Sequence, residues 1–117
     1  MAMSDITIWH NPRCTKSRET LALLEGRGIT PVVRKYLDDS PDATELRDAL
    51  RALGLRAIDM MRPKEAAFKA AGLSRTSDED TLIAAMVMTP KLIERPIVFK
   101  DGRARIGRPP EAVLDLL

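Results

Sequence analysis

Hydrophobic and polar positions in the first forty residues predict a strand, a helix and a second strand. Residues 6–9 alternate as a strand does, and from Thr15 onward apolar residues recur at helical spacing until the glycines of 26–28. Residues 32–37 predict the second strand. Such a strand-helix-strand unit requires parallel strands and a right-handed crossover.

The middle of the chain, 41–88, shows helical patterns and no strand. Ser40 and Pro41 resemble an N-cap followed by a first helical residue, and the apolar face that follows them ends at Gly54. Residues 77–80 resemble a capping box with acidic residues in the first turn of a later helix. In chain order the helical patterns cover 43–53, 58–61, 64–71 and 82–87.

A second β-rich part begins after residue 90. Asp101-Gly102 lies between the strand-like runs 96–99 and 103–107, and Asp-Gly at that place favours a hairpin. A last helix is predicted at 112–117. This order of elements is the thioredoxin-like plan with a helical insert. It predicts an α/β fold in which a four-stranded mixed sheet carries helices on its faces. We expect one domain over 1–117, with the insert at about 41–90.

Composition excludes several classes of function. No apolar run approaches the roughly 20 residues that span a bilayer, and the N-terminus lacks the pattern of a secretory signal. One cysteine cannot form an internal disulfide, so we expect a cytoplasmic protein. The 19 basic and 17 acidic residues are interspersed and aromatic content is 3%, which argues against nucleic-acid binding. No glycine-rich phosphate loop occurs, and one His with one Cys cannot make a four-ligand zinc site, so we expect no bound cofactor and no metal.

The single cysteine, Cys14, is the strongest candidate for chemistry. It lies between the first predicted strand and the first predicted helix, where unpaired N–H groups and the helix dipole favour an anion. Arg13, Lys16 and Arg18 add positive charge to the same turn. Cysteines in such places have a lowered pKa and react as thiolates. The alternative is a small buried hydrophobic residue, as many lone cysteines are.

Four separated motifs carry a family resemblance. They are His10-Asn11-Pro12-x-Cys14-x-x-Ser17-Arg18, Met61-Arg62, Glu94-Arg95-Pro96-Ile97-Val98 and 107–115, which reads GRPPEAVLD. In this order they resemble the glutaredoxin-dependent arsenate reductase family over nearly the whole chain from Ile6. The same framework occurs in regulators that bind RNA polymerase and in small thiol-binding relatives.

The resemblance implies a role for each of six residues. Cys14 resembles the nucleophile that attacks arsenate and forms a covalent adduct. His10 and Ser17 are similar to the residues that tune the thiolate from the turn. Arg62, Arg95 and Arg108 resemble the three arginines of the oxyanion site, and guanidinium forks suit arsenate oxygens. Taken singly, each arginine is more typical of an exposed side chain beside a carboxylate, and the motif around each one favours the oxyanion site.

Two further expectations follow from these motifs. Arg95-Pro96, at the entry to a strand, resembles the cis-proline turn that faces the active-site cysteine in thioredoxin-like folds. Ser17 occupies the place that would complete a C-x-x-C pair, so turnover requires a thiol from outside the chain. The resemblance implies glutathione followed by glutaredoxin. The competing hypothesis is a relative without arsenate activity, such as a redox-sensing regulator that binds RNA polymerase.

Overall fold

The computed structural model describes residues 5–117, and these residues form two compact units. The first unit contains residues 5–39 and 95–117, and the second contains Ser40–Glu94. The first unit holds every strand of the described chain. The second is made of helices and the loops between them.

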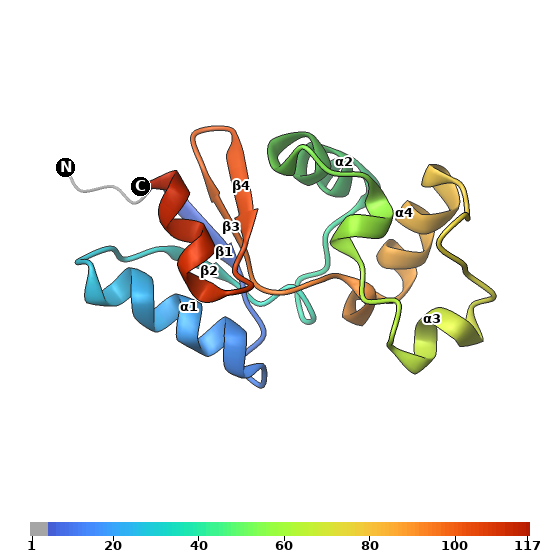
Figure 1. Ribbon diagram of the computed structural model, residues 1–117, viewed down its shortest axis with the longest axis horizontal. Helices are drawn as coiled ribbons and strands as arrows, with labels where there is room; N and C mark the ends of the chain where they lie inside the picture. Colours follow the sequence, from blue (N-terminus) through green and yellow to red (C-terminus); the bar gives the residue numbers. More distant parts are fainter. Residues whose placement is uncertain (1–4) are drawn as a thin grey trace. The chain divides into compact units, whose positions relative to one another are not determined.

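The first unit is built on a four-stranded mixed sheet (Figure 1). Its strands are β1 (Ile6–Trp9), β2 (Val32–Arg34), β3 (Ile97–Lys100) and β4 (Arg103–Ile106), and their order across the sheet is β2-β1-β3-β4. β1 pairs with β2 in parallel, whereas β3 pairs antiparallel with both β1 and β4. The predicted mixed sheet and the parallel strand-helix-strand unit are therefore confirmed.

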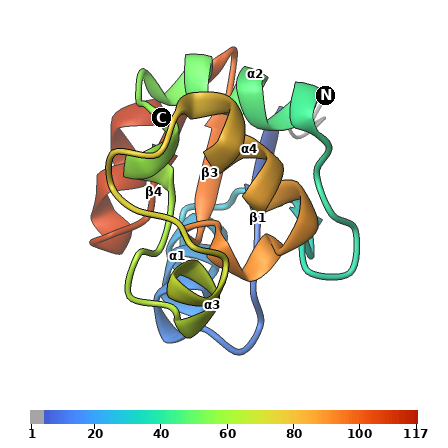
Figure 2. The ribbon, with the colours of Figure 1, turned by 90° about the vertical axis from the view of Figure 1, so that its right-hand side faces the viewer.

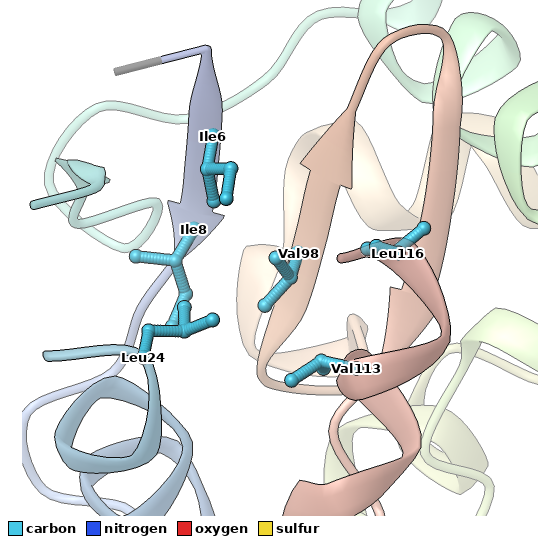
Figure 3. Packing of buried hydrophobic residues seen from close by; sticks show 6 residues of the cluster. All are labelled: Ile6, Ile8, Leu24, Val98, Val113 and Leu116. Carbon is cyan, nitrogen blue, oxygen red and sulfur yellow. The ribbon is translucent and has the colours of Figure 1, made fainter. Parts of the chain in front are cut away.

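Two helices cover one face of this sheet, α1 (Thr15–Gly26) and the 3-10 helix η3 (Pro110–Leu116). Side chains at alternate positions of a strand point to the same face, so Ile6 and Ile8 of β1 both point toward these helices. Figure 3 shows the resulting core cluster, which also takes side chains from α1, β3 and η3. Its six members are Ile6, Ile8, Leu24, Val98, Val113 and Leu116.

Aromatic residues occupy the opposite face of the sheet. Trp9, the only tryptophan of the chain, is 5% exposed. Its ring centroid lies 4.9 Å from that of Phe99 on β3, in a tilted arrangement. The Arg34 guanidinium carbon lies 5.5 Å from the Trp9 ring centroid, within cation–π range. This cluster ties β1 to both neighbouring strands.

The second unit packs its two longest helices together, α2 (Ala43–Leu53) and α4 (Glu79–Met88), which Figure 2 shows near one another. Both helices have buried apolar positions at helical spacing, such as Leu46 and Leu50 on α2. The shorter helices are η1 (Ala57–Met60), α3 (Ala66–Ala70) and η2 (Pro90–Leu92).

Several predicted boundaries were wrong. The second strand ends at Arg34 and not at residue 37, because the N–H groups of Asp38 and Asp39 both bond to the carbonyl of Lys35 and turn the chain there. Ser40 is not the cap of α2. Asp42 is the cap and forms a capping box with Glu45.

The later helices also differ from their patterns. The helix predicted at 64–71 is confined to Ala66–Ala70, and the C-terminal helix is a 3-10 helix that starts at Pro110. The acidic first turn of α4 is confirmed, but the capping box predicted at 77–80 is not formed, because Asp78 and not Ser77 is the N-cap and its side chain accepts from the N–H of Thr81.

Turns of the first unit match their sequence signals. Asp101 and Gly102 both have positive φ, 52° and 78°, as a type I′ hairpin turn requires. The Arg95-Pro96 peptide is cis, which confirms that prediction, and Arg108-Pro109 is a second cis peptide that the sequence analysis did not predict.

Candidate active site

Cys14 is the N-cap of α1, where the sequence predicted it. Its backbone is extended, with φ −93° and ψ 123°, and its carbonyl accepts the N–H of Arg18 at 3.0 Å to start the helix. Its own N–H bonds to the carbonyl of Asn11 at 3.0 Å and closes the preceding turn. The residue is partly exposed, so a reagent in solvent can reach it.

Four donors surround the Cys14 sulfur. Burial disfavours the thiolate, but the backbone N–H of Ser17, the Arg95 side chain, the backbone N–H of Lys16 and the charge of Arg108 together hold the pKa of Cys14 below its usual value. Nη2 of Arg108 donates to Sγ at 3.4 Å. Because N–H groups of the first helical turn and two guanidinium groups favour an anion at the sulfur, the arrangement suits a nucleophilic thiolate.

Arg95 and Arg108 support each other at this position. Nε of Arg108 donates to the carbonyl of Arg95 at 2.8 Å, so the guanidinium group is held at one nitrogen and directed to Sγ through another. Arg95 is partly buried, whereas Arg108 is exposed. Two guanidinium groups beside one sulfur form an anion site, in which the same donors can bind the oxygens of a substrate oxyanion.

His10 and Ser17 lie together beneath this turn and are both buried. Nδ1 of His10 is 2.6 Å from Oγ of Ser17, and the same oxygen accepts the N–H of Asn11 at 3.0 Å. Burial is the main cause that holds the pKa of His10 below its usual value, and it therefore favours the neutral imidazole. The positive charges of Lys35 and Arg18 act in the same direction, and the charge of Glu25 opposes them. Ser17 therefore joins the cysteine turn to the end of β1.

Two of the three charged side chains expected around Cys14, those of Arg18 and Lys16, have other partners. Nη1 of Arg18 donates to the carbonyl of Pro12 at 3.0 Å, and Nζ of Lys16 lies 3.4 Å from the Glu19 carboxylate. The groups that lower the pKa of Cys14 are the backbone N–H groups of Lys16 and Ser17 and two arginines from distant segments. The expectation that the charges of Arg13, Lys16 and Arg18 lower this pKa was wrong, because all three residues are exposed and their charges do not contribute to it.

Arg62 belongs to the second unit. It forms ion pairs with Glu65 and Glu94, each at 3.3 Å, and its N–H donates to the carbonyl of Leu92 at 2.8 Å. The structure thus brings Arg95, Arg108 and Cys14 together, and the convergence of Arg62 on the same site stays a prediction.

Asn11 has a structural part in the site that the sequence analysis missed. Its carbonyl, side-chain oxygen and N–H hold Cys14, Arg13 and Ser17 respectively. The signal was the Asn-Pro dipeptide, which favours turns. Within residues 5–117, no three His, Cys, Asp or Glu side chains are grouped to hold a metal ion. No helix in that range is long and apolar enough to cross a membrane.

Comparison with known proteins agrees with this geometry. The ArsC family model matches residues 9–116. An arsenate reductase of Neisseria meningitidis serogroup A is 50% identical over 113 residues, which cover 95% of this chain and 97% of the relative. The uncharacterized protein YfgD of Escherichia coli K12 is 53% identical over 114 residues, 96% of each chain.

Solved structures give the same result. The structure described as an arsenate reductase from Vibrio cholerae has a TM-score of 0.95 at 54% identity and covers all of both chains. The structure described as a putative arsenate reductase from Yersinia pestis has a TM-score of 0.90, also at 54% identity, over 95% of this chain and 99% of that one.

Proposed function

The chain belongs to the ArsC family, and on that premise we propose that it reduces arsenate to arsenite through a covalent adduct on Cys14, with glutathione and glutaredoxin as electron donors. The observation that carries this proposal is the thiol at the N-cap of α1 with Arg95 and Arg108 beside its sulfur. A thiolate and an oxyanion repel each other, and the positive charges of Arg95 and Arg108 reduce this repulsion as the two groups approach.

In the first step the Cys14 thiolate attacks the arsenic of arsenate. A sulfur–arsenic bond forms, one arsenic–oxygen bond breaks, and that oxygen leaves as water after protonation. Arg95 and Arg108 neutralise the oxygens as the sulfur approaches, which is electrostatic stabilisation of a developing charge. Arg62 is proposed as the third oxyanion ligand on the family resemblance alone.

The following steps need thiols from outside the chain, since Cys14 is its one cysteine. Two thiol groups are oxidised to one disulfide, arsenic is reduced from the +5 to the +3 state, and arsenite leaves with the Cys14 thiol restored. Glutathione supplies the first thiol and glutaredoxin completes the reduction. Because this cycle requires reduced thiols, we place it in the cytoplasm.

His10 and Ser17 act as positioning residues in this proposal. The Ser17 hydroxyl is held between the His10 ring and the Asn11 N–H, and the backbone N–H of Ser17 donates to the sulfur. Their hydrogen bonds keep the N-terminal turn of α1 in the geometry that favours the thiolate.

The test is arsenite formation by the purified protein with arsenate, glutathione and glutaredoxin. Omission of each thiol donor in turn identifies which of them is required. Cys14→Ser is the matched control, since it removes the nucleophilic thiol and puts a hydroxyl group of similar size at the N-cap of α1. If the protein forms no more arsenite than Cys14→Ser, the enzyme proposal fails. The competing hypothesis, a family relative without this activity such as an RNA polymerase regulator, then replaces it.

A further inference from the structure

Gly107 occupies the tightest glycine position in the described chain. An ideal Cβ built on it would lie 2.5 Å from Oγ1 and 3.2 Å from Cγ2 of Thr20, and 2.8 Å from Cγ of Pro96. At the other five glycines the same Cβ would have nothing within 4 Å. Gly107 does not have a positive φ, so the position demands space and not an unusual backbone conformation.

Neither Thr20 nor Pro96 can move away easily from a Cβ at residue 107. Thr20 is fully buried in α1, and its hydroxyl donates to the carbonyl of Lys16 at 2.8 Å. The Pro96 ring is closed onto the backbone nitrogen, which limits the movement of its Cγ, and the N–H of Gly107 donates to the Pro96 carbonyl at 2.9 Å. A methyl group at residue 107 would therefore push apart three backbone segments.

These three segments supply the side chains and N–H groups that contact the Cys14 sulfur. Thr20 lies one turn after the Lys16 and Ser17 N–H groups, Pro96 directly follows Arg95, and Gly107 directly precedes Arg108. The distances from the sulfur to both arginines therefore depend on how closely the segments meet at the Gly107 Cα.

We propose that Gly107 is a positioning residue of the Cys14 site, where the absence of a side chain sets how closely Arg95 and Arg108 approach the N-terminal turn of α1. Gly107 touches neither the sulfur nor the substrate. It acts through Arg108, whose Nη2 is 3.4 Å from Sγ, and through the Arg95 carbonyl that accepts Nε of Arg108 at 2.8 Å. The catalytic consequence rests on the proposed function, but the geometry does not.

The test is the rate of Cys14 alkylation by iodoacetamide as a function of pH, followed by mass spectrometry. The chain has one cysteine, so the signal comes from one site. In Gly107→Ala we expect the inflection to move to higher pH and the alkylation rate at pH 6 to fall roughly tenfold, the factor for one lost charge-assisted hydrogen bond. Gly26→Ala is the matched control, because its Cβ meets nothing within 4 Å and its φ is not positive.

A compensating substitution separates positioning from stability. Thr20→Ala removes both Thr20 atoms near the added methyl group and leaves the Pro96 Cγ at 2.8 Å, so the double variant Gly107→Ala, Thr20→Ala should regain part of the loss. Thr20→Ala alone is the fourth protein of this double-mutant cycle. If Gly107→Ala lowers thermal stability but keeps the wild-type alkylation profile, Gly107 is only structural and the proposal is overturned. It is also overturned if the double variant recovers nothing.

The double variant also decides the outcome if Gly107→Ala does not fold. It must then fold and show an alkylation inflection at higher pH than that of Thr20→Ala, because the contact with Pro96 remains, and a failure to fold or a profile identical to that of Thr20→Ala rejects the proposal. Alkylation needs no arsenate, so a wild-type protein without arsenate reduction would remove the proposed function and leave the role of Gly107 standing.

Discussion

Replacement of Arg108 by alanine is the most direct perturbation of the anion site. The change removes the donor to Sγ of Cys14 and the hydrogen bond from Nε to the Arg95 carbonyl, and it leaves the cysteine turn intact. The side chain is exposed, so its loss creates no cavity and we expect the fold to be retained. The pKa of Cys14 should rise, because one of the charges that lowers it is gone.

The structure sets the size of the effect. At the 3.4 Å between Nη2 and Sγ, the attraction between two unit charges is about 1.2 kcal/mol even at the dielectric constant of water. Hydrogen bonds to charged groups contribute about 1.5–3 kcal/mol, and exposure places Arg108 near the lower end of that range. A loss of about 1–2 kcal/mol corresponds to a roughly 5- to 30-fold fall in kcat/KM for arsenate.

The assay is arsenite formation at saturating glutathione and glutaredoxin over a series of arsenate concentrations. Arg27→Ala is the control for net charge, since it removes an exposed arginine from the far end of α1. Arg108→Lys should recover only part of the rate, because one ammonium group cannot reproduce the two directed donors of the guanidinium. Wild-type kcat/KM together with a wild-type alkylation profile in Arg108→Ala would refute the assigned role.

Three further predictions concern ionisation and stability. The alkylation rate of Cys14 should inflect below the ordinary cysteine pKa, because the pKa of Cys14 is lowered in the folded state. The thiolate should therefore stabilise the folded protein above the unfolded-state pKa, and this stability should be lost as the pH falls through the folded-state pKa. A urea midpoint that does not change with pH across this window would contradict the prediction. Ser17→Ala should cost about 1–3 kcal/mol in urea unfolding, since it removes the two buried hydrogen bonds of the hydroxyl group, and an unchanged midpoint would show that these bonds add nothing. Asp42→Ala should cost about 1 kcal/mol through the lost capping box, whereas Ser40→Ala should have no effect, and equal midpoints for the two variants would remove Asp42 as the cap.

Local patterns predicted most of the fold because the decisive signals are short in range. The apolar alternation of β1 and the Asp-Gly turn between β3 and β4 act within a few residues. The errors arose where two local signals compete. Ser40 and Asp42 are both good N-caps, and only Asp42 stands three residues before a glutamate that can return the hydrogen bond.

The active site was only partly predictable, because the contacts that form it join distant segments of the chain. The position of Cys14 follows from the pattern around it, but the arginines beside its sulfur come from segments about 80 and 94 residues away. The proline after Arg95, at the entry to a strand, is a local signal only in combination with the thioredoxin-like plan. The arginines were found through the family resemblance. The demand for space at Gly107 depends on packing between α1, Pro96 and β4, which no sequence pattern reports.

The buried position of Trp9 gives the first unit a fluorescent probe of its own. Its emission reports on the sheet, where it contacts Phe99 and Arg34, while α2 and α4 of the second unit, together with α1 of the first, give the helical circular dichroism. Fluorescence and ellipticity recorded through one urea titration therefore measure how many cooperative transitions the chain has. Superimposable curves would mean that the helical unit unfolds with the sheet, and separated curves would give each unit a free energy of its own.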